Sequence, residues 1–210
     1  MIGYNDYRLQ NLDGQSIASD IQEIRWNISQ IEKRGFKHFM LKEIFEQPEA
    51  VQNTLRGRIT NGQIKLSLNT DFSRVQRIII AACGTSWHSA LIGKNLIEKY
   101  TGIPTEVDYA SEFRYRESII NGEVLMIVIS QSGETADTLA ALRKAKSAGT
   151  QTLGIINVVG STIAREVNSG IYLHAGPEIG VASTKAFICQ VIALLLLALY
   201  IKQQKGELID

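Results

Sequence analysis

The chain has 210 residues, enough for one ordinary domain with a full hydrophobic core and a short appendage before it. Hydrophobic residues make up 45% of the chain and charged residues 20%, a balance that is typical of globular proteins and excludes wholesale disorder. The formal net charge is +1, so the chain lacks the basic surplus that draws proteins onto nucleic acids. We therefore expect no nucleic-acid partner.

Cysteine usage and hydropathy predict a cytoplasmic location. Cys83 and Cys189 lie far apart, and neither belongs to a Cys/His cluster with metal-ligand spacing, so we expect reduced thiols and no metal site. The polar N-terminus lacks the apolar stretch of a secretory signal. The most apolar run, 191–201, is shorter than the roughly 18 residues that span a bilayer. It predicts a buried helix or one side of a subunit interface, and no membrane partner.

The first part of the chain differs from the rest. Four isoleucines stand at helical spacing in a polar segment, which predicts a linker helix: Ile21, Ile24, Ile28 and Ile31. A second helical stretch covers about 36–55, and Pro48 should bend or interrupt it. Its expected apolar face consists of Phe39, Met40, Ile44, Val51 and Leu55.

From Arg74 onward, short apolar runs alternate with longer amphipathic ones. The apolar runs predict strands at 77–82, 104–110, 123–130, 151–158 and 170–175. The amphipathic runs predict helices at 86–102, 134–149 and 161–167, with an apolar helix starting near Lys185. Because parallel neighbours need crossover connections, this order predicts an α/β fold with a parallel sheet covered by helices on both faces.

Three loops between strands and helices carry hydroxyl groups, at 83–89, 130–135 and 180–185. Ligands of open parallel sheets bind beyond the carboxyl ends of the strands, and helix N-termini offer unpaired amides to anions. Serine and threonine are also common helix caps, so a single loop of this kind does not require a ligand. The loop 130–135 has three hydroxyls where one cap needs one. Because no nucleotide-binding glycine motif is present, we expect a small phosphorylated metabolite.

Five segments carry a family resemblance: 38–48, 81–90, 110–118, 129–139 and 178–187. Together they resemble the isomerase part of the glutamine:fructose-6-phosphate aminotransferase (isomerizing) family, and they occur in that family's order. The resemblance implies the sugar isomerase (SIS) fold, a doubly wound, flavodoxin-like parallel sheet flanked by helices. It also implies that residues 1–35 are a remnant of a glutaminase-domain tail and linker, and that 36–210 form one SIS domain.

The same resemblance implies a ligand and the residues that hold it. The family converts fructose 6-phosphate and glutamine to glucosamine 6-phosphate and glutamate, works as a dimer, and needs no cofactor or metal. By position, the sugar phosphate is held by Thr85, Ser86, Ser130, Gln131, Ser132 and Thr135, and the sugar is contacted by Val181 and Ser183. These residues belong to the three loops that their chemistry had already singled out.

The chain departs from the family in extent, because the resemblance covers only the first of two SIS subdomains. In the family, the base, the ring-opening histidine and the Schiff-base lysine come from the second subdomain and a C-terminal loop, so we expect no catalytic residue in this chain. By itself the chain should be inactive, because isomerisation requires a general base placed against a specific carbon. A non-catalytic sugar-phosphate sensor and a dimerisation module remain as alternatives.

Several charged or titratable residues near the loops have two interpretations. Glu134 would oppose a phosphate unless it turned away, and Lys185 is more simply neutralising or structural than a nucleophile. The histidines at 38, 88 and 174 are more simply packed or surface residues than bases. The segment 110–118 mixes aromatic residues with arginines, which fits either a subunit interface or a solvated turn.

Overall fold

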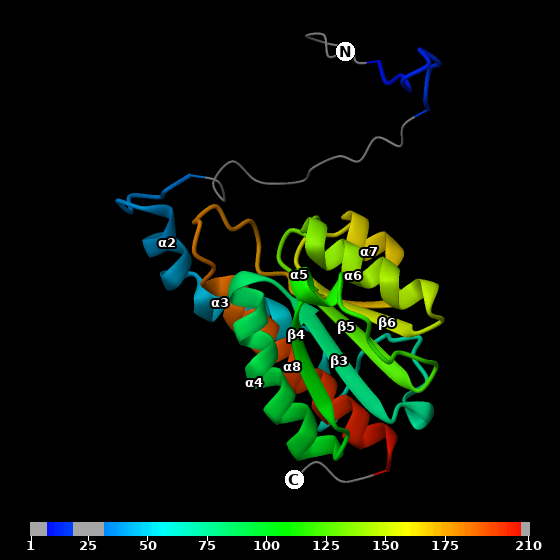
Figure 1. The fold of residues 1–210 in the computed structure, drawn as a ribbon. Helices are drawn as coiled ribbons and strands as arrows, with labels where there is room; N and C mark the ends of the chain where they lie inside the picture. Colours follow the sequence, from blue (N-terminus) through cyan, green and yellow to red (C-terminus); the bar gives the residue numbers. More distant parts are fainter. Residues whose placement is uncertain (1–7, 19–31, 207–210) are drawn as a thin grey trace.

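The computed structural model describes residues 8–18 and 32–206. The expected linker helix with Ile21, Ile24, Ile28 and Ile31 lies outside these residues. Within them, a single five-stranded sheet organises the fold (Figure 1).

The sheet has the strand order of a flavodoxin-like fold. Its strands are β3 (Arg77–Ala82), β4 (Thr105–Tyr109), β5 (Val124–Ser130), β6 (Gln151–Ile156) and β7 (Ser169–Tyr172). They lie in the order β4-β3-β5-β6-β7, and every neighbouring pair is parallel. Numbered by appearance, this is the 2-1-3-4-5 order of doubly wound sheets. The predicted fold class is confirmed.

Helices cover both faces of the sheet, as the alternation predicted (Figure 1). On one face α4 (Gly84–Thr101) and α8 (Lys185–Gln204) pack over a core that includes Ile78 and Ile80 of β3. On the other face α5 (Ala110–Phe113), α6 (Ala136–Ser147) and α7 (Thr162–Glu166) enclose a second core with Ile79. Successive β3 residues point to opposite faces, and both faces are buried, which explains the continuous apolar run in the sequence.

Helix α8 lies in the interior of the domain. Its 20 residues are long and apolar enough to cross a membrane by length and composition alone. In the structure it packs against α3 and α4 and buries one side, which includes Leu194, Leu197 and Ile201, while Ile192, Leu195 and Leu199 are only half-buried. The buried side confirms the prediction of a buried helix for 191–201, and a subunit interface on the half-buried side stays a prediction.

The helical stretch predicted at 36–55 is two helices, α2 (Phe39–Phe45) and α3 (Gln47–Leu55). They meet at Glu46, and Pro48 stands in the first turn of α3, where its missing amide hydrogen costs nothing.

The apolar face predicted for α2 is wrong. Met40 and Ile44 are 42% and 40% exposed, whereas Lys42 and Glu43 are each only 2% exposed. The physical reason is that the inner side of α2 meets a polar loop rather than the apolar core. Glu43 Oε1 accepts hydrogen bonds from the amides of Ile179 and Gly180 in that loop, at 2.6 and 3.1 Å.

Three short elements were not predicted. One is a hairpin of β1 (Ile59–Thr60) and β2 (Gln63–Ile64), joined through Asn61 and Gly62 at positive φ. Asn-Gly between short strands is a known hairpin signal that the sequence analysis passed over. The second is a 3-10 turn at Phe72–Arg74. The third is α5.

Helix α5 shows which residues of the segment 110–118 pack inside the domain and which lie on its surface. Phe113 is fully buried in the second core cluster, so it packs inside the domain rather than at an interface. Arg114 pairs with Asp137 of α6 at 2.6 Å, and Arg116 pairs with Asp108 of β4. Tyr115 remains 78% exposed.

Candidate functional site

The strand order places two of the three hydroxyl-bearing segments side by side, and we call the region between them the crevice. Strands β3 and β5 are neighbours, but the helices that follow them, α4 and α6, pack on opposite faces of the sheet. The segments that follow these strands are Cys83 with the first turn of α4, and the loop 130–135. They therefore diverge from the carboxyl edge of the sheet, which is the switch point where ligands bind in open α/β sheets. The structure thus brings together Thr85, Ser86, Ser130, Gln131, Ser132 and Thr135.

The loop after β5 is tightly turned by its own hydroxyls. Ser130 is 2% exposed, and its Oγ accepts a hydrogen bond from the amide of Gly133 at 2.9 Å and lies 3.1 Å from Thr135 Oγ1. Gly133 has a φ of 68°, and a Cβ there would lie only 2.0 Å from Ser161 Oγ. The turn therefore requires glycine, and it leaves the side chains of Gln131 and Ser132 partly exposed at its tip.

Two helices begin at this crevice without side-chain caps. The N-cap residue of α4 is Cys83 and that of α6 is Thr135, and neither makes a side-chain capping bond among the described residues. The first amides of a helix have no partner inside the helix, and the helix dipole is positive at this end. Both first turns are therefore suited to an anion in the crevice.

The one carboxylate in the loop after β5 points to another helix. Glu134 Oε1 accepts a hydrogen bond from the amide of Thr162 at the start of α7, at 2.6 Å. That hydrogen bond, helped by the charge of Arg165, lowers the pKa of Glu134. The negative charge is thereby used as a cap for α7, which removes the conflict with a bound phosphate.

The third hydroxyl loop has a different environment. Glu178 Oε1 accepts from the amides of Thr184 and Ala186 at 2.9 and 3.2 Å, so a carboxylate of the chain already occupies the N-terminus of α8. Ser183 Oγ donates to the same carboxylate at 2.8 Å, and Val181 is fully exposed. The loop runs from the sheet past α2 to the start of α8 (Figure 1). The start of α8 is therefore not a second anion site.

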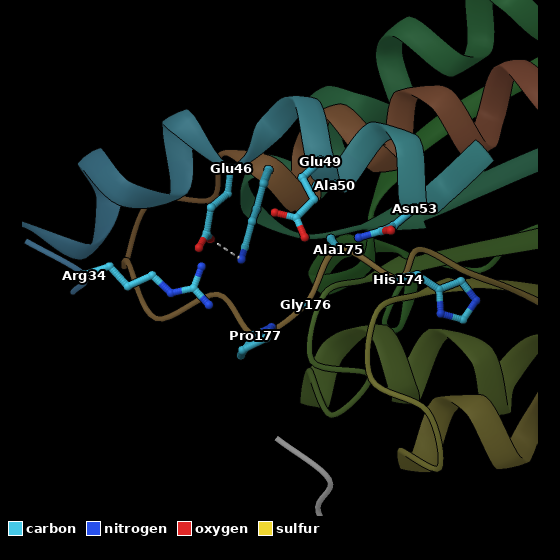
Figure 2. A pocket seen from close by; sticks show the side chains of 10 residues that line it. Arg34, Glu46, Glu49, Ala50, Asn53, His174, Ala175, Gly176 and Pro177 are labelled. Atoms are coloured by element: carbon cyan, nitrogen blue, oxygen red, sulfur yellow. Dashed lines mark hydrogen bonds and ion pairs between the residues drawn. The ribbon is translucent and has the colours of Figure 1, made fainter. Parts of the chain in front are cut away.

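A pocket lies on the α2 and α3 side of this loop, and Figure 2 shows its lining. Inside it Lys185, which is 4% exposed, forms an ion pair with Glu46 at 2.7 Å, and Lys42 lies 3.5 Å from the other oxygen of Glu46. His174 also lines the pocket, with a φ of 54°, and burial together with the charge of Arg58 lowers its pKa. Lys185 therefore has the structural role expected from the sequence, because its charge is neutralised by Glu46.

The remaining candidates are surface or packing residues. His38 and His88 are exposed, and the ring of His88 meets the edge of Trp87 at 5.1 Å between centroids. Cys83 and Cys189 are free thiols, and burial raises the pKa of Cys189. Across 8–18 and 32–206, no group of three or more His, Cys, Asp or Glu is placed to hold a metal ion.

Sequence reasoning missed two polar residues behind Ser86. Gln190 of α8 is fully buried, and its Nε2 donates to Ser86 Oγ at 2.9 Å. Ser89, also fully buried, has its Oγ 2.9 Å from Gln190 Oε1. The signal was an amide residue in an otherwise apolar helix, since a buried amide is costly unless it is hydrogen-bonded.

Comparison with known proteins identifies the family. The model of the SIS domain family matches residues 71–200. The chain belongs to the SIS domain family. The match covers the sheet from β3 to β7 and both crevice loops.

Sequence relatives show which members of the SIS domain family the chain resembles. The chain is 52% identical over 212 residues to a glutamine–fructose-6-phosphate aminotransferase (isomerizing) of Chlorobaculum tepidum, covering 98% of the chain and 34% of the relative. The corresponding protein of Clostridium tetani is 52% identical over 207 residues, with 96% and 34% covered. The chain thus spans about a third of the length of these relatives, and the predicted resemblance is confirmed.

A solved structure agrees in fold and sequence. The C-terminal domain of the glucosamine-fructose-6-phosphate aminotransferase from Francisella tularensis superposes with a TM-score of 0.79 at 45% identity. The match covers 85% of the SIS domain chain and 51% of that structure. The SIS domain described here therefore corresponds to about half of that C-terminal domain.

Proposed function

We propose that this SIS domain binds fructose 6-phosphate, or its amino-sugar product glucosamine 6-phosphate, with the phosphate in the crevice between β3 and β5. The observation that carries the proposal is the meeting of two hydroxyl-rich loops with two helix N-termini that lack side-chain caps at the switch point. The phosphate ligands are Ser86, Ser130, Gln131, Ser132 and Thr135, with Thr85 contributing at the backbone.

The chemistry of the crevice suits a dianion. Its loops contain no lysine or arginine, so binding relies on neutral hydroxyl and amide donors and on the helix dipoles. The carboxylate of Glu134 is directed to α7. Val181 and Ser183 contribute from the third loop, which is the sugar side of the proposed site.

We infer that the protein works as part of a larger enzyme. The relatives are aminotransferases about three times as long, which supports conversion of fructose 6-phosphate and glutamine to glucosamine 6-phosphate and glutamate in the whole protein. The groups for proton transfer and amination then lie outside this chain. Residues 1–35 serve as a glutaminase-domain tail and linker, and 36–210 as the SIS domain, in a cytoplasmic enzyme that needs no cofactor.

Assembly with other domains or a second copy is part of this proposal. Helix α2 presents a row of apolar side chains that the described residues leave partly exposed: Met40, Leu41, Ile44 and Phe45. Such an apolar row favours burial against a partner surface, and a homodimer built on SIS domains fits it.

Calorimetric titration of the 210-residue chain tests the proposal. Fructose 6-phosphate should bind and raise the melting temperature, because a ligand that binds only the folded state stabilises it. Fructose without phosphate should do neither, and the chain alone should form no glucosamine 6-phosphate. Absence of binding by both hexose phosphates at millimolar concentration would contradict the proposal and favour a dimerisation module. Binding without turnover in the intact protein would favour a sensor.

A further inference from the structure

Gln190 is a buried polar residue next to the proposed phosphate site. It lies in the second turn of α8, among side chains that are otherwise apolar, and it is 0% exposed. Both ends of its amide reach α4: Nε2 lies 2.9 Å from Ser86 Oγ and Oε1 lies 2.9 Å from Ser89 Oγ. A buried amide therefore connects the interior of the domain with the first turn of α4.

The polarity of these hydrogen bonds decides what Ser86 can do. A serine hydroxyl has one hydrogen to donate and two lone pairs to accept. Because Ser86 Oγ accepts the hydrogen of Gln190 Nε2, its own hydrogen remains for another acceptor. Among the described residues, the Ser86 hydroxyl has no second recorded partner. Its O–H is therefore available to a ligand in the crevice.

The structure assigns Ser89 as a hydrogen-bond donor to the oxygen of this amide. Its hydroxyl has two acceptors within reach, Gln190 Oε1 and the carbonyl oxygen of Ser86, at 2.9 and 2.7 Å. When it donates to Oε1, the amide must present its NH₂ group to Ser86. The reversed amide would accept the Ser86 hydrogen instead and leave a lone pair facing the crevice, which repels an anion.

We propose that Gln190 is a positioning residue that holds the Ser86 hydroxyl as a hydrogen-bond donor to the phosphate of a bound sugar phosphate. This inference rests on the proposed function and adds to it a buried residue that does not touch the ligand. The alternative role is purely structural, a polar tie between α8 and α4 that contributes stability and nothing to binding.

A double-mutant cycle separates the two roles. Gln190→Met keeps the volume and removes the donor, and it should weaken fructose 6-phosphate binding by about three- to tenfold, the scale of one hydrogen bond. Ser86→Ala should weaken binding on its own. If Gln190 acts through Ser86, adding Gln190→Met to Ser86→Ala should cause no further loss. Additive losses, or unchanged affinity in Gln190→Met, would overturn the inference.

A matched control comes from the other end of the same helix. Gln203 also uses both amide ends, accepting from the amide of Ile64 at 2.9 Å and donating to the carbonyl of Ile64 at 3.2 Å. Gln203→Met should lower stability and leave affinity unchanged. A loss of affinity there equal to that of Gln190→Met would assign the effect to α8 stability and overturn the inference.

The variant Gln190→Glu should make the affinity depend on pH in a way that a purely structural role of Gln190 would not. Burial at this position should raise the pKa of the introduced carboxyl above the ordinary glutamate value of about 4.3, so that it ionises within the pH range tested. When ionised it can only accept, so it should capture the Ser86 hydrogen and repel the phosphate; when protonated it can donate again. The ratio of variant to wild-type dissociation constants should therefore rise by about tenfold or more between pH 5.5 and 8.5. Taking the ratio divides out the pH effects that the variant shares with wild type, including those of phosphate ionisation.

The outcomes distinguish this inference from the proposed function. Wild-type binding with a pH-independent ratio, while circular dichroism shows a folded variant, would overturn the role of Gln190 and leave the phosphate site standing. No binding by the wild-type chain would overturn both. The expected result is wild-type binding, non-additivity with Ser86→Ala, and a ratio that rises with pH.

Discussion

The hydroxyl of Ser132 is the exposed donor at the tip of the loop after β5. Its Oγ accepts from the amide of Glu134 at 3.2 Å, which leaves its hydrogen for a ligand. Ser132→Ala should weaken fructose 6-phosphate binding by about 1 to 3 kcal/mol, the scale of a hydrogen bond to a charged group. Isothermal titration calorimetry measures this directly.

Ser147 provides the control for that substitution. It is an exposed serine at the opposite end of α6, and its hydroxyl donates to the carbonyl of Lys144 in its own helix at 2.8 Å. Ser147→Ala should leave affinity unchanged. Equal affinities in the two variants would remove Ser132 from the phosphate site.

Glu134 gives the loop a pH dependence of stability. Its folded-state pKa is lowered, chiefly by the hydrogen bond from the Thr162 amide, so the ionised form stabilises the folded state. That contribution is present above the ordinary glutamate pKa of about 4.3 and is lost as pH falls through the lower folded value. Glu134→Gln should therefore lower the melting temperature at pH 7 and differ less from wild type near pH 3. A difference that stayed constant over this range would contradict the capping role.

At the scale of elements, the ion pair between Lys185 and Glu46 connects the start of α8 with the junction of α2 and α3 (Figure 2). Glu46→Gln would leave Lys185 buried without its counter-charge, and breaking such a pair costs about 3 kcal/mol or more. Urea unfolding should show a loss of that size. The control is Glu166→Gln, which breaks the more exposed pair with Arg143 at 2.6 Å and should cost about 1 kcal/mol or less. Equal losses would contradict the structural role of Lys185.

The elements that local pattern determines could be predicted from the sequence. The bounds of β3 are those of its apolar run, and α4 ends at Gly102, which takes the left-handed conformation. The wrong predictions concerned residues whose burial depends on contacts with distant parts of the chain. The apolar side of α2 could not be assigned, because its inner side packs on a polar loop, and Phe113 looked like an interface residue until α5 placed it in the core.

In the candidate site, too, local features could be predicted from the sequence, whereas contacts between distant residues could not. The hydroxyl loops were visible because each comes directly after an apolar run, and the strand order brings the first two together. The orientation of Glu134 and the contact between Gln190 and Ser86 were not visible, since they join residues 28 and 104 positions apart in the chain.

For the molecule as a whole, the strand order predicts where ligand protection should appear. The crevice loops follow adjacent strands, so one bound phosphate contacts both, while the hairpin β1–β2 takes no part in the five-stranded sheet. Amides of β3 and β5 are buried on both faces and should exchange with solvent only through opening of the domain core.

Hydrogen-exchange mass spectrometry with saturating fructose 6-phosphate should therefore show local protection in peptides covering 83–89 and 130–137. Exchange in β3 and β5 should slow by the factor set by ligand occupancy, because binding stabilises the folded state as a whole. Peptides covering the hairpin at 59–64 should change least. Protection confined to 177–185 and the pocket around His174 would place the ligand beside α2 and contradict the crevice site, even if calorimetry showed binding.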